Sequence, residues 1–232
     1  MIECDYIECG DCYTLIKGIP DKSIDLIITD PPYEITGGKS GGCFGREKRN
    51  YHGELYDTGL DKGINNNILN ELVRVMKKIN IYIWCNKNQL RQYLDFFGDL
   101  GATCDLLTWH KTNPVPTCNN KYLSDTEYCL YFRKDGVPLH GSYETKKKYY
   151  VTPTNKEDKK LYKHPTIKPL DIIQNLIINS SQEGDIVLDP FLGSGTTAVA
   201  CVNTNRHYIG FELNKEYFDT ACKRLDEVEE TA

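Results

Sequence analysis

A short run from Asp185 to Thr197 constrains the fold of this chain more than any other feature. Its apolar stretch leads through a turn that contains Gly193 and Gly195 and then into the start of a helix. Glycines let a backbone approach a ligand closely, and the amides at the start of the following helix point toward that ligand. Glu212 ends the next apolar stretch, where an acid suits the hydroxyl pair of a ribose. The run therefore predicts a strand–turn–helix unit at a nucleoside-binding site.

The glycine turn by itself leaves more than one ligand open. A nucleoside triphosphate is disfavoured, because the P-loop pattern needs a lysine after its last glycine and Thr196 stands there. A dinucleotide such as NAD is open, since Gly193, Gly195 and Ala198 satisfy G-x-G-x-x-A. S-adenosylmethionine is a third candidate, and a structural turn without a ligand is the simplest explanation. The rest of the chain has to separate them.

Helices and strands are expected to alternate along the chain. Hydrophobic periodicity predicts strands over 23–29, 80–84, 102–110, 127–132, 185–189 and 207–211, and helices over 67–79, 89–97, 170–179, 196–202 and 215–229. This alternation predicts a Rossmann-like α/β fold, a mostly parallel sheet with helices on both faces. Two late strands follow each other without a helix, which allows an antiparallel edge strand. We expect a single domain over 1–232, with a long glycine-rich loop at about 37–59.

Composition places the chain among ordinary globular proteins. Hydrophobic residues make up 40% and charged residues 26%, and no apolar run reaches the length of a membrane span. The first residues lack the pattern of a signal peptide. The ten cysteines are scattered, mostly among apolar residues, as free thiols in a reducing cytosol would be. Cys9 and Cys12 form one C-x-x-C without a second pair, so we expect no metal site, no membrane partner and a cytoplasmic location.

A second motif stands at the end of an early apolar run. Asp30, Pro31, Pro32 and Tyr33 follow the strand predicted over 23–29, which places them at the carboxyl edge of the sheet. The prolines stiffen the backbone and remove two amide donors. Asp30 and the Pro31 carbonyl could then accept the two hydrogens of an amino group, while Tyr33 stacks on the ring that carries it. Such acceptors would orient the weakly nucleophilic amine of adenine or cytosine, once the base is flipped out of the duplex.

Basic residues gather in the second half of the chain, although the formal net charge is −5. Between Arg133 and Lys163, nine lysines and arginines stand against four acids, which gives +5 there and leaves −10 for the other residues. Lysines beside aromatic rings suit phosphate contacts and base stacking, and this segment offers Lys146, Lys147, Lys148 and Tyr149. The loop at 37–59 adds Arg46 and Arg49. We predict that these residues contact DNA; a solvated lysine-rich loop is the alternative.

Taken in order, the motifs resemble those of the amino-methyltransferase branch of DNA methyltransferases, in its permuted β-type order with the catalytic motif first. The segment 30–33 matches the catalytic tetrapeptide Asp-Pro-Pro-Tyr, and 189–195 matches the cofactor motif. His164 to Pro169 resembles the HPTQKP segment, with Ile167 where glutamine is common. Residues 10–11, 81–84 and 109–111 also fit, so the resemblance covers nearly the whole chain.

This resemblance implies a site-specific DNA methyltransferase that uses S-adenosyl-L-methionine and acts on double-stranded DNA. Asp11 would approach the cofactor adenine, Glu212 the ribose and Lys168 the methionine carboxylate. The implied cofactor-binding residues are Asp11, Lys168, Asp189, Pro190, Phe191, Gly193, Ser194, Gly195, Thr196 and Glu212, and the catalytic ones are Asp30, Pro31, Pro32 and Tyr33. Related enzymes for cytosine more often carry serine in place of Asp30, which favours the N6 amine of adenine over the N4 amine of cytosine.

The interval at about 134–163 departs from the family, whose target-recognition region is usually longer at this place. A short recognition sequence, help from the 37–59 loop, or a homodimer would each account for the difference. The sequence does not indicate whether a partner restriction nuclease exists.

Other activities fit less of the chain. Methylation of the ring carbon of cytosine commonly uses the cysteine of a Pro-Cys pair, and no such pair occurs. Glutamine-modifying protein methyltransferases usually carry asparagine in place of Asp30, and structured RNA is a weaker substrate candidate. An NAD-dependent oxidoreductase would leave residues 30–33 unexplained. A DNA-binding module without catalysis stays open, although both motifs are intact in the sequence.

Overall fold

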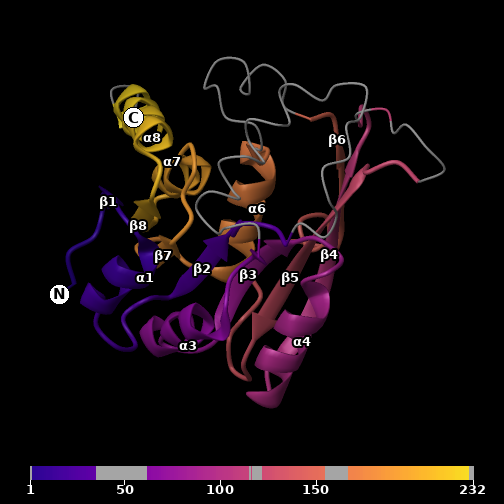
Figure 1. Ribbon diagram of the computed structural model, residues 1–232, viewed down its shortest axis with the longest axis horizontal. Coiled ribbons are helices and arrows are strands. Elements are labelled where there is room, and N and C mark those ends of the chain that lie inside the picture. Colours follow the sequence, from indigo (N-terminus) through magenta and orange to yellow (C-terminus); the bar gives the residue numbers. More distant parts are fainter. Residues whose placement is uncertain (1, 35–61, 115, 117–121, 155–166, 230–232) are drawn as a thin grey trace.

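The structure is a computed structural model that describes residues 2–34, 62–114, 116, 122–154 and 167–229 (Figure 1). Helices and strands alternate through most of these residues, as the sequence predicts. In chain order they are β1 (Tyr6–Cys9), α1 (Cys12–Leu15), the 3-10 helix η1 (Ile16–Gly18), β2 (Leu26–Thr29), α3 (Asn66–Val75), β3 (Asn80–Cys85), α4 (Leu90–Asp99), β4 (Thr103–Lys111), β5 (Thr126–Arg133), β6 (Tyr149–Thr152), α6 (Leu170–Ser180), β7 (Ile186–Asp189), α7 (Thr196–Asn203), β8 (His207–Glu212) and α8 (Lys215–Glu229).

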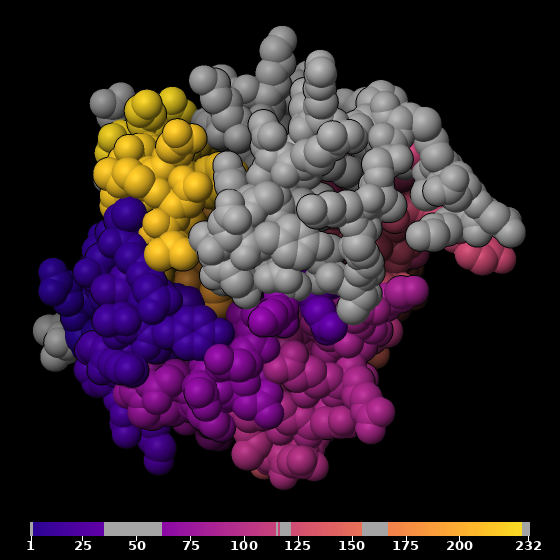
Figure 2. All heavy atoms as spheres, viewed as in Figure 1, coloured from indigo at the N-terminus to yellow at the C-terminus, as the bar shows by residue number. Residues whose placement is uncertain are grey.

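These strands form one eight-stranded sheet in the order β1-β8-β7-β2-β3-β5-β4-β6. Every neighbouring pair is parallel except those of β5, which runs antiparallel to both β3 and β4. The antiparallel strand expected at the edge therefore lies inside the sheet, and both edge strands are parallel to their neighbours. Pairing of β1 with β8 joins the two ends of the chain, whose indigo and yellow surfaces adjoin in Figure 2.

Helices cover both faces of the sheet, which confirms the predicted layers (Figure 1). One core contains residues of α1, α3 and α4, and the other contains residues of α6, α7 and α8. Strands β2 and β3 are buried along their whole length, as their continuous apolar runs predict for strands covered on both sides. Among the residues that the structure describes, no helix has both the length and the apolar composition needed to cross a membrane.

The order of the strands changes direction between β7 and β2. The chain passes from β7 through α7 to β8 on one side, and from β2 through α3 to β3 on the other. In open α/β sheets, ligands bind outside the carboxyl ends of the strands at such a switch point. The motif beginning with Asp30 follows β2 directly, and the turn with Gly193 and Gly195 follows β7. The fold thus brings the two sequence motifs to the same crevice.

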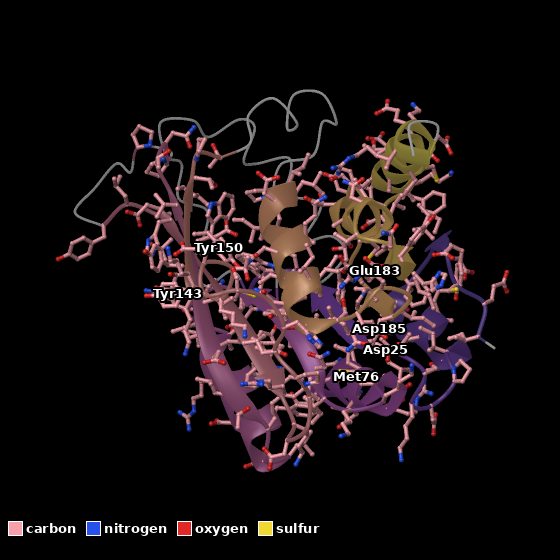
Figure 3. The ribbon with its side chains drawn as sticks, turned by 180° about the vertical axis from the view of Figure 1, so that it is seen from behind. Asp25, Met76, Tyr143, Tyr150, Glu183 and Asp185 are labelled. Atoms are coloured by element: carbon pink, nitrogen blue, oxygen red, sulfur yellow. The ribbon has the colours of Figure 1, made fainter. Side chains whose placement is uncertain are left out.

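Two strands, β1 and β6, have no clear signal in the sequence. In β1, Tyr6 and Ile7 are partly buried while Glu8 and Cys9 are exposed, so no clear alternation marks the strand. Strand β6 lies in the basic segment and pairs with β4, with Tyr149 and Val151 exposed. Its Tyr150 turns instead toward α6 (Figure 3), where the hydroxyl accepts a 2.6 Å hydrogen bond from Asn175 Nδ2. Helix α3 also ends earlier than expected, at Val75.

Candidate active site

A cavity of about 1030 Å³ opens at the carboxyl ends of β7 and β2. Its walls come from the segments that follow β1, β2, β3, β7 and β8, together with Glu127 of β5 and the start of α6. All four residues of the Asp-Pro-Pro-Tyr motif line it, as do Asp11, Lys168 and Glu212. Two predicted sites therefore share one space, with the Asp30 end and the glycine end facing the same cavity.

The backbone after β2 is fixed by two amide side chains from the segment beyond β3. Gln89 Nε2 donates to the Pro32 carbonyl at 3.1 Å, and Asn86 Nδ2 donates to the Glu34 carbonyl at 2.8 Å. Gln89 is fully buried, and its position also requires Gly63, where a Cβ atom would lie 2.9 Å from Gln89 Nε2. These contacts hold the proline turn without using the Pro31 carbonyl.

A chain of alternating charges forms the Asp30 end of the cavity. Lys168 Nζ contacts Asp30 Oδ2 and lies 3.1 Å from Glu127 Oε2, while Lys111 Nζ contacts the other oxygen of Glu127. The side chain of Lys168 is only 7% exposed, whereas that of Asp30 keeps 24%. Tyr33 joins this group through its hydroxyl, which is 3.4 Å from Lys168 Nζ and from Glu127 Oε2.

One oxygen of this group lacks a hydrogen-bond partner in the part of the chain that the structure describes. Asp30 Oδ1 is buried, and no described residue donates a hydrogen bond to it. A buried acceptor without a donor costs free energy unless a ligand supplies the donor. Asp30 Oδ1 is therefore a position in the cavity that can take an N–H or O–H group from a substrate.

Burial and charge together set the protonation of these side chains. Burial alone would lower the pKa of Lys168, but Asp30 and Glu127 raise it above its usual range. Burial alone would raise the pKa of Glu127, yet Lys168 and Lys111 hold it at about 2. Burial raises the pKa of Asp30, an effect that Lys168 only partly offsets. Glu127 is thus firmly ionised, and Asp30 is the more basic of the two carboxylates.

The glycine end is shaped by backbone geometry. Gly193 and Gly195 have φ angles of 58° and 84°, in the left-handed region that glycine adopts without strain. A Cβ atom on Gly195 would lie 2.9 Å from the Cβ atom of Ala221 in α8. Arg224 of α8, which is 4% exposed, donates to the Ser194 carbonyl at 2.7 Å and supports the turn from behind. The turn is therefore built tightly against α8.

Carboxylates at the glycine end are held by hydrogen bonds from the backbone and from hydroxyls. Glu212 accepts from the Gly193 amide at 2.7 Å, and Asp189 accepts from the Phe191 amide at 3.1 Å and from Thr197 Oγ1 at 2.6 Å. Burial raises the pKa of Glu212, and it raises the pKa of Asp189 to about 7, against these hydrogen bonds. Asp11 caps α1 and accepts from the Tyr13 amide at 3.2 Å.

The remaining cofactor candidates also fall on this turn. Pro190, Phe191, Ser194 and Thr196 line the cavity with Gly193, whereas Gly195 is not among its lining residues and acts through the shape of the turn. Lys168 lies at the other end, against Asp30, in this structure.

The residues predicted to contact DNA differ in exposure and in whether they already have an acidic partner. Lys147 pairs with Glu144, and Lys148 pairs with Asp105. Lys146 is exposed, and no acid among the described residues pairs with its ammonium group. Tyr149 is 56% exposed on β6. Arg46 and Arg49 lie outside the described residues.

Several residues of the site are absent from the sequence-based set, among them Glu127, Gln89, Asn86 and Arg224. Glu127 is an acid at the start of an apolar strand, a signal that could have marked it. Gln89 and Asn86 follow the strand next to β2 at the same edge of the sheet, which is a weaker signal. Arg224 gives none, because a basic residue in an amphipathic surface helix is ordinarily solvated.

Comparisons with known proteins agree with this geometry. A family model described as DNA methylase, of the N6/N4 type, matches residues 24–223. The Type II methyltransferase M2.LlaDCHI of Lactococcus lactis subsp. cremoris is 30% identical over 94% of this chain and 87% of its own length. The Type II methyltransferase M2.DpnII of Streptococcus pneumoniae is 29% identical over 96% of this chain and 90% of its own.

Solved structures show the same fold. A crystal structure of an M1.HpyAVI–SAM complex superposes with a TM-score of 0.69 at 28% identity, covering 94% of this chain and 98% of the other. The cytosine-N4-specific PvuII DNA methyltransferase superposes with a TM-score of 0.73 over 99% of this chain and 92% of its own, but at 15% identity it speaks for the fold alone. With the matched family model and both motifs on one cavity, the chain belongs to the N6/N4 DNA methylases.

Proposed function

We propose that this chain transfers the methyl group of S-adenosylmethionine to the N6 amine of an adenine that is flipped out of double-stranded DNA. The observation that carries the proposal is the unpartnered Asp30 Oδ1, buried in a cavity that also holds the glycine turn. An exocyclic amine presents two N–H donors, and Asp30 Oδ1 can accept one of them. Among the described residues, no amide donates to the Pro31 carbonyl, which can accept the other.

The residues of the glycine end fit S-adenosylmethionine. Its ribose and its ammonium group are hydrogen-bond donors, and Asp11, Asp189 and Glu212 offer carboxylate oxygens in the same part of the cavity. Each carboxylate has about four lone-pair sites, so the backbone donors that already hold these acids leave capacity for a ligand. Phe191 and Leu213 give this part apolar walls. When bound, S-adenosylmethionine supplies an electrophilic methyl group on a sulfonium.

The protein's own residues make the amine able to react. Its lone pair is delocalised into the ring, and two acceptors on its hydrogens draw the nitrogen toward tetrahedral geometry. Tyr33 lines the same wall and can stack on the base. The methylated amine then has to lose a proton, and the raised pKa of Asp30 makes Asp30 Oδ1 a better acceptor than an ordinary aspartate.

The basic segment before β6 is held in a way that suits DNA contact. Asn175 and Asn179 of α6 both donate to the Thr145 carbonyl, at 2.9 and 2.8 Å, next to Lys146. Helix α6 begins two residues after Lys168, so one rigid element connects the cavity with this segment. We place phosphate contacts at Lys146 first, because Lys147 and Lys148 already have acidic partners.

The test is methyl transfer to unmethylated DNA with labelled S-adenosylmethionine, followed by mass spectrometry of the nucleosides. We expect N6-methyladenine from the parent protein. N4-methylcytosine would keep the geometry and overturn the choice of base. If the protein binds S-adenosylmethionine and labels only RNA or protein, the DNA claim fails.

A further inference from the structure

The ion pair between Lys168 and Asp30 determines which oxygen of Asp30 faces the base. The ammonium group of Lys168 contacts Asp30 Oδ2, whereas Asp30 Oδ1 has no hydrogen-bond donor among the described residues and is open to the amine. Lys168 is 7% exposed, and an ammonium group buried to that extent is costly unless it is well paired. A second anion beside Asp30 is therefore needed to fix the position of Lys168.

Glu127 stands where that second anion is needed. Its Oε2 atom lies 3.1 Å from Lys168 Nζ, so the ammonium group is held between Glu127 and Asp30 at the cavity wall. Trp84 and Tyr33 limit where the ammonium group can go, since their ring centroids lie 5.1 and 5.6 Å from it. Tyr33 also reaches Glu127 with its hydroxyl.

The sheet holds Glu127 in place and balances its charge. Glu127 pairs with Trp109 across the antiparallel β4–β5 ladder, and Lys111 lies two residues further along β4 on the same face. The ammonium group of Lys111 contacts Glu127 Oε1 and lies 5.2 Å from the Trp109 ring centroid. Lys111, Glu127, Lys168 and Asp30 therefore alternate in sign and sum to zero.

We propose that Glu127 is a positioning residue of the methyl transfer, which holds Lys168 against Asp30 Oδ2 so that Asp30 Oδ1 stays directed at the amine of the target base. This inference rests on the proposed function. Lys111 contacts the other oxygen of Glu127 and so helps to fix the carboxylate that holds Lys168. The low pKa of Glu127 keeps the carboxylate charged at any working pH.

The central test is the Glu127→Gln variant, which keeps the size of the side chain and removes its charge. At saturating DNA and cofactor, kcat should fall roughly tenfold to a hundredfold, the range expected when a group near the reacting atoms is misplaced. Cofactor affinity, measured by calorimetry, should stay close to that of the parent. Glu127→Asp keeps the charge and should recover part of the loss. The matched control is Glu71→Gln, which removes an ion-paired glutamate of α3 that is not among the lining residues of the cavity and should leave kcat unchanged.

The pH profile separates positioning from a merely structural role. Glu127 raises the pKa of Asp30, so Glu127→Gln should move the acid limb of kcat/KM to lower pH. Lys111→Gln leaves the charge of Glu127 less balanced and should move that limb to higher pH, with a smaller loss of kcat. Shifts of the acid limb in opposite directions support the proposal. If Glu127→Gln does not fold, the pH profile of Lys111→Gln and the kcat of Glu127→Asp provide the test.

Two results would overturn the inference while the parent still methylates DNA. One is a kcat of Glu127→Gln equal to that of the parent. The other is a loss confined to cofactor affinity, which would mean that Lys168 and Glu127 serve the methionine carboxylate instead. A parent protein that labels no DNA would count against the proposed function. This outcome is seen in the parent alone, so it is distinct from the two results above, which compare variants with an active parent.

Discussion

The two ends of the cavity hold their acids in different ways. At the glycine end, Glu212 and Asp189 are held by backbone amides and a hydroxyl, and the shape of the turn is set by Gly195 against Ala221. At the other end, Asp30 and Glu127 are held by lysines, and no residue that the structure describes donates to one oxygen of Asp30. Backbone hydrogen bonds fix a shape, whereas ion pairs can exchange partners. The first end is suited to binding and the second to a reaction in which contacts change.

The largest expected effect comes from removing Lys168, the cation that Asp30 and Glu127 share. Lys168→Met leaves Asp30 and Glu127 without their common partner, and breaking a buried ion pair in this way costs about 3–5 kcal/mol of stability. The pKa of Asp30 should rise further, because Lys168 is the charge that lowers it. A carboxyl with a raised pKa in the folded state stabilises at low pH and loses that contribution as pH rises, so the defect should grow as the pH rises above the usual pKa of an aspartate.

Urea unfolding at several pH values measures this difference. Lys77→Met is the control, since Lys77 is 52% exposed in its pair with Asp25 and such pairs contribute about 0.2–1 kcal/mol. Equal and small effects of the two substitutions would contradict a large contribution of the buried pair to stability.

The next effect tests the tight glycine turn. Gly195→Ala places a side chain at a φ of 84° and 2.9 Å from Ala221. Gly184→Ala is a matched control, with a φ of 81° and open space around the added atom. Both should lose roughly 1–2 kcal/mol to backbone strain, and only Gly195→Ala should lose about 1–3 kcal/mol more to overpacking. Equal losses of stability in the two variants, measured by thermal or urea unfolding, would show that α8 shifts to accommodate the added methyl group.

A smaller effect concerns cofactor binding at the same end. The two carboxylate oxygens of Glu212 accept from the backbone amides of Gly193 and Asn214. In Glu212→Gln the side-chain NH2 group faces one of these amides, and a buried donor without an acceptor costs about 1–3 kcal/mol. Affinity for S-adenosylmethionine should fall roughly tenfold, since 1.4 kcal/mol is a factor of ten. At saturating cofactor, kcat should change little, which calorimetry and steady-state kinetics can separate. A loss of kcat without a loss of affinity for S-adenosylmethionine would mean that Glu212 serves the reaction and not cofactor binding, and would contradict the division of the cavity into two ends.

The smallest effect concerns DNA binding outside the cavity. Lys146→Ala should weaken binding to all DNA sequences alike and reduce the slope of log affinity against log salt by about 1, as expected for one phosphate contact. Lys147→Ala is the comparison, because Lys147 already pairs with Glu144 and should change the slope less. Fluorescence anisotropy over a salt series distinguishes them, and an unchanged slope in both would remove this segment from the interface.

Sequence and structure agree best where a pattern has a single physical meaning. Continuous apolar runs predict β2 and β3, and the glycine turn predicts the start of α7. The contacts of Glu127 and Lys168 depend on the order of the strands, since β5 and the segment before α6 meet Asp30 only after the sheet is assembled. No local pattern gives that order. Strand β6 is not predicted, because it has only four residues and directly follows three lysines. Its pairing partner, β4, lies far away in the sequence.

The division of the cavity into a binding end and a reacting end is tested most directly by comparing binding with transfer in Asp30→Asn. The variant keeps the shape of the side chain but presents an amide in place of the carboxylate that faces the base. We predict cofactor affinity within about threefold of the parent, and methyl transfer to DNA reduced by about 10²–10³, the range seen when one preorganised hydrogen-bonding group is removed. Transfer at the rate of the parent, or loss of cofactor binding together with transfer, would contradict that division.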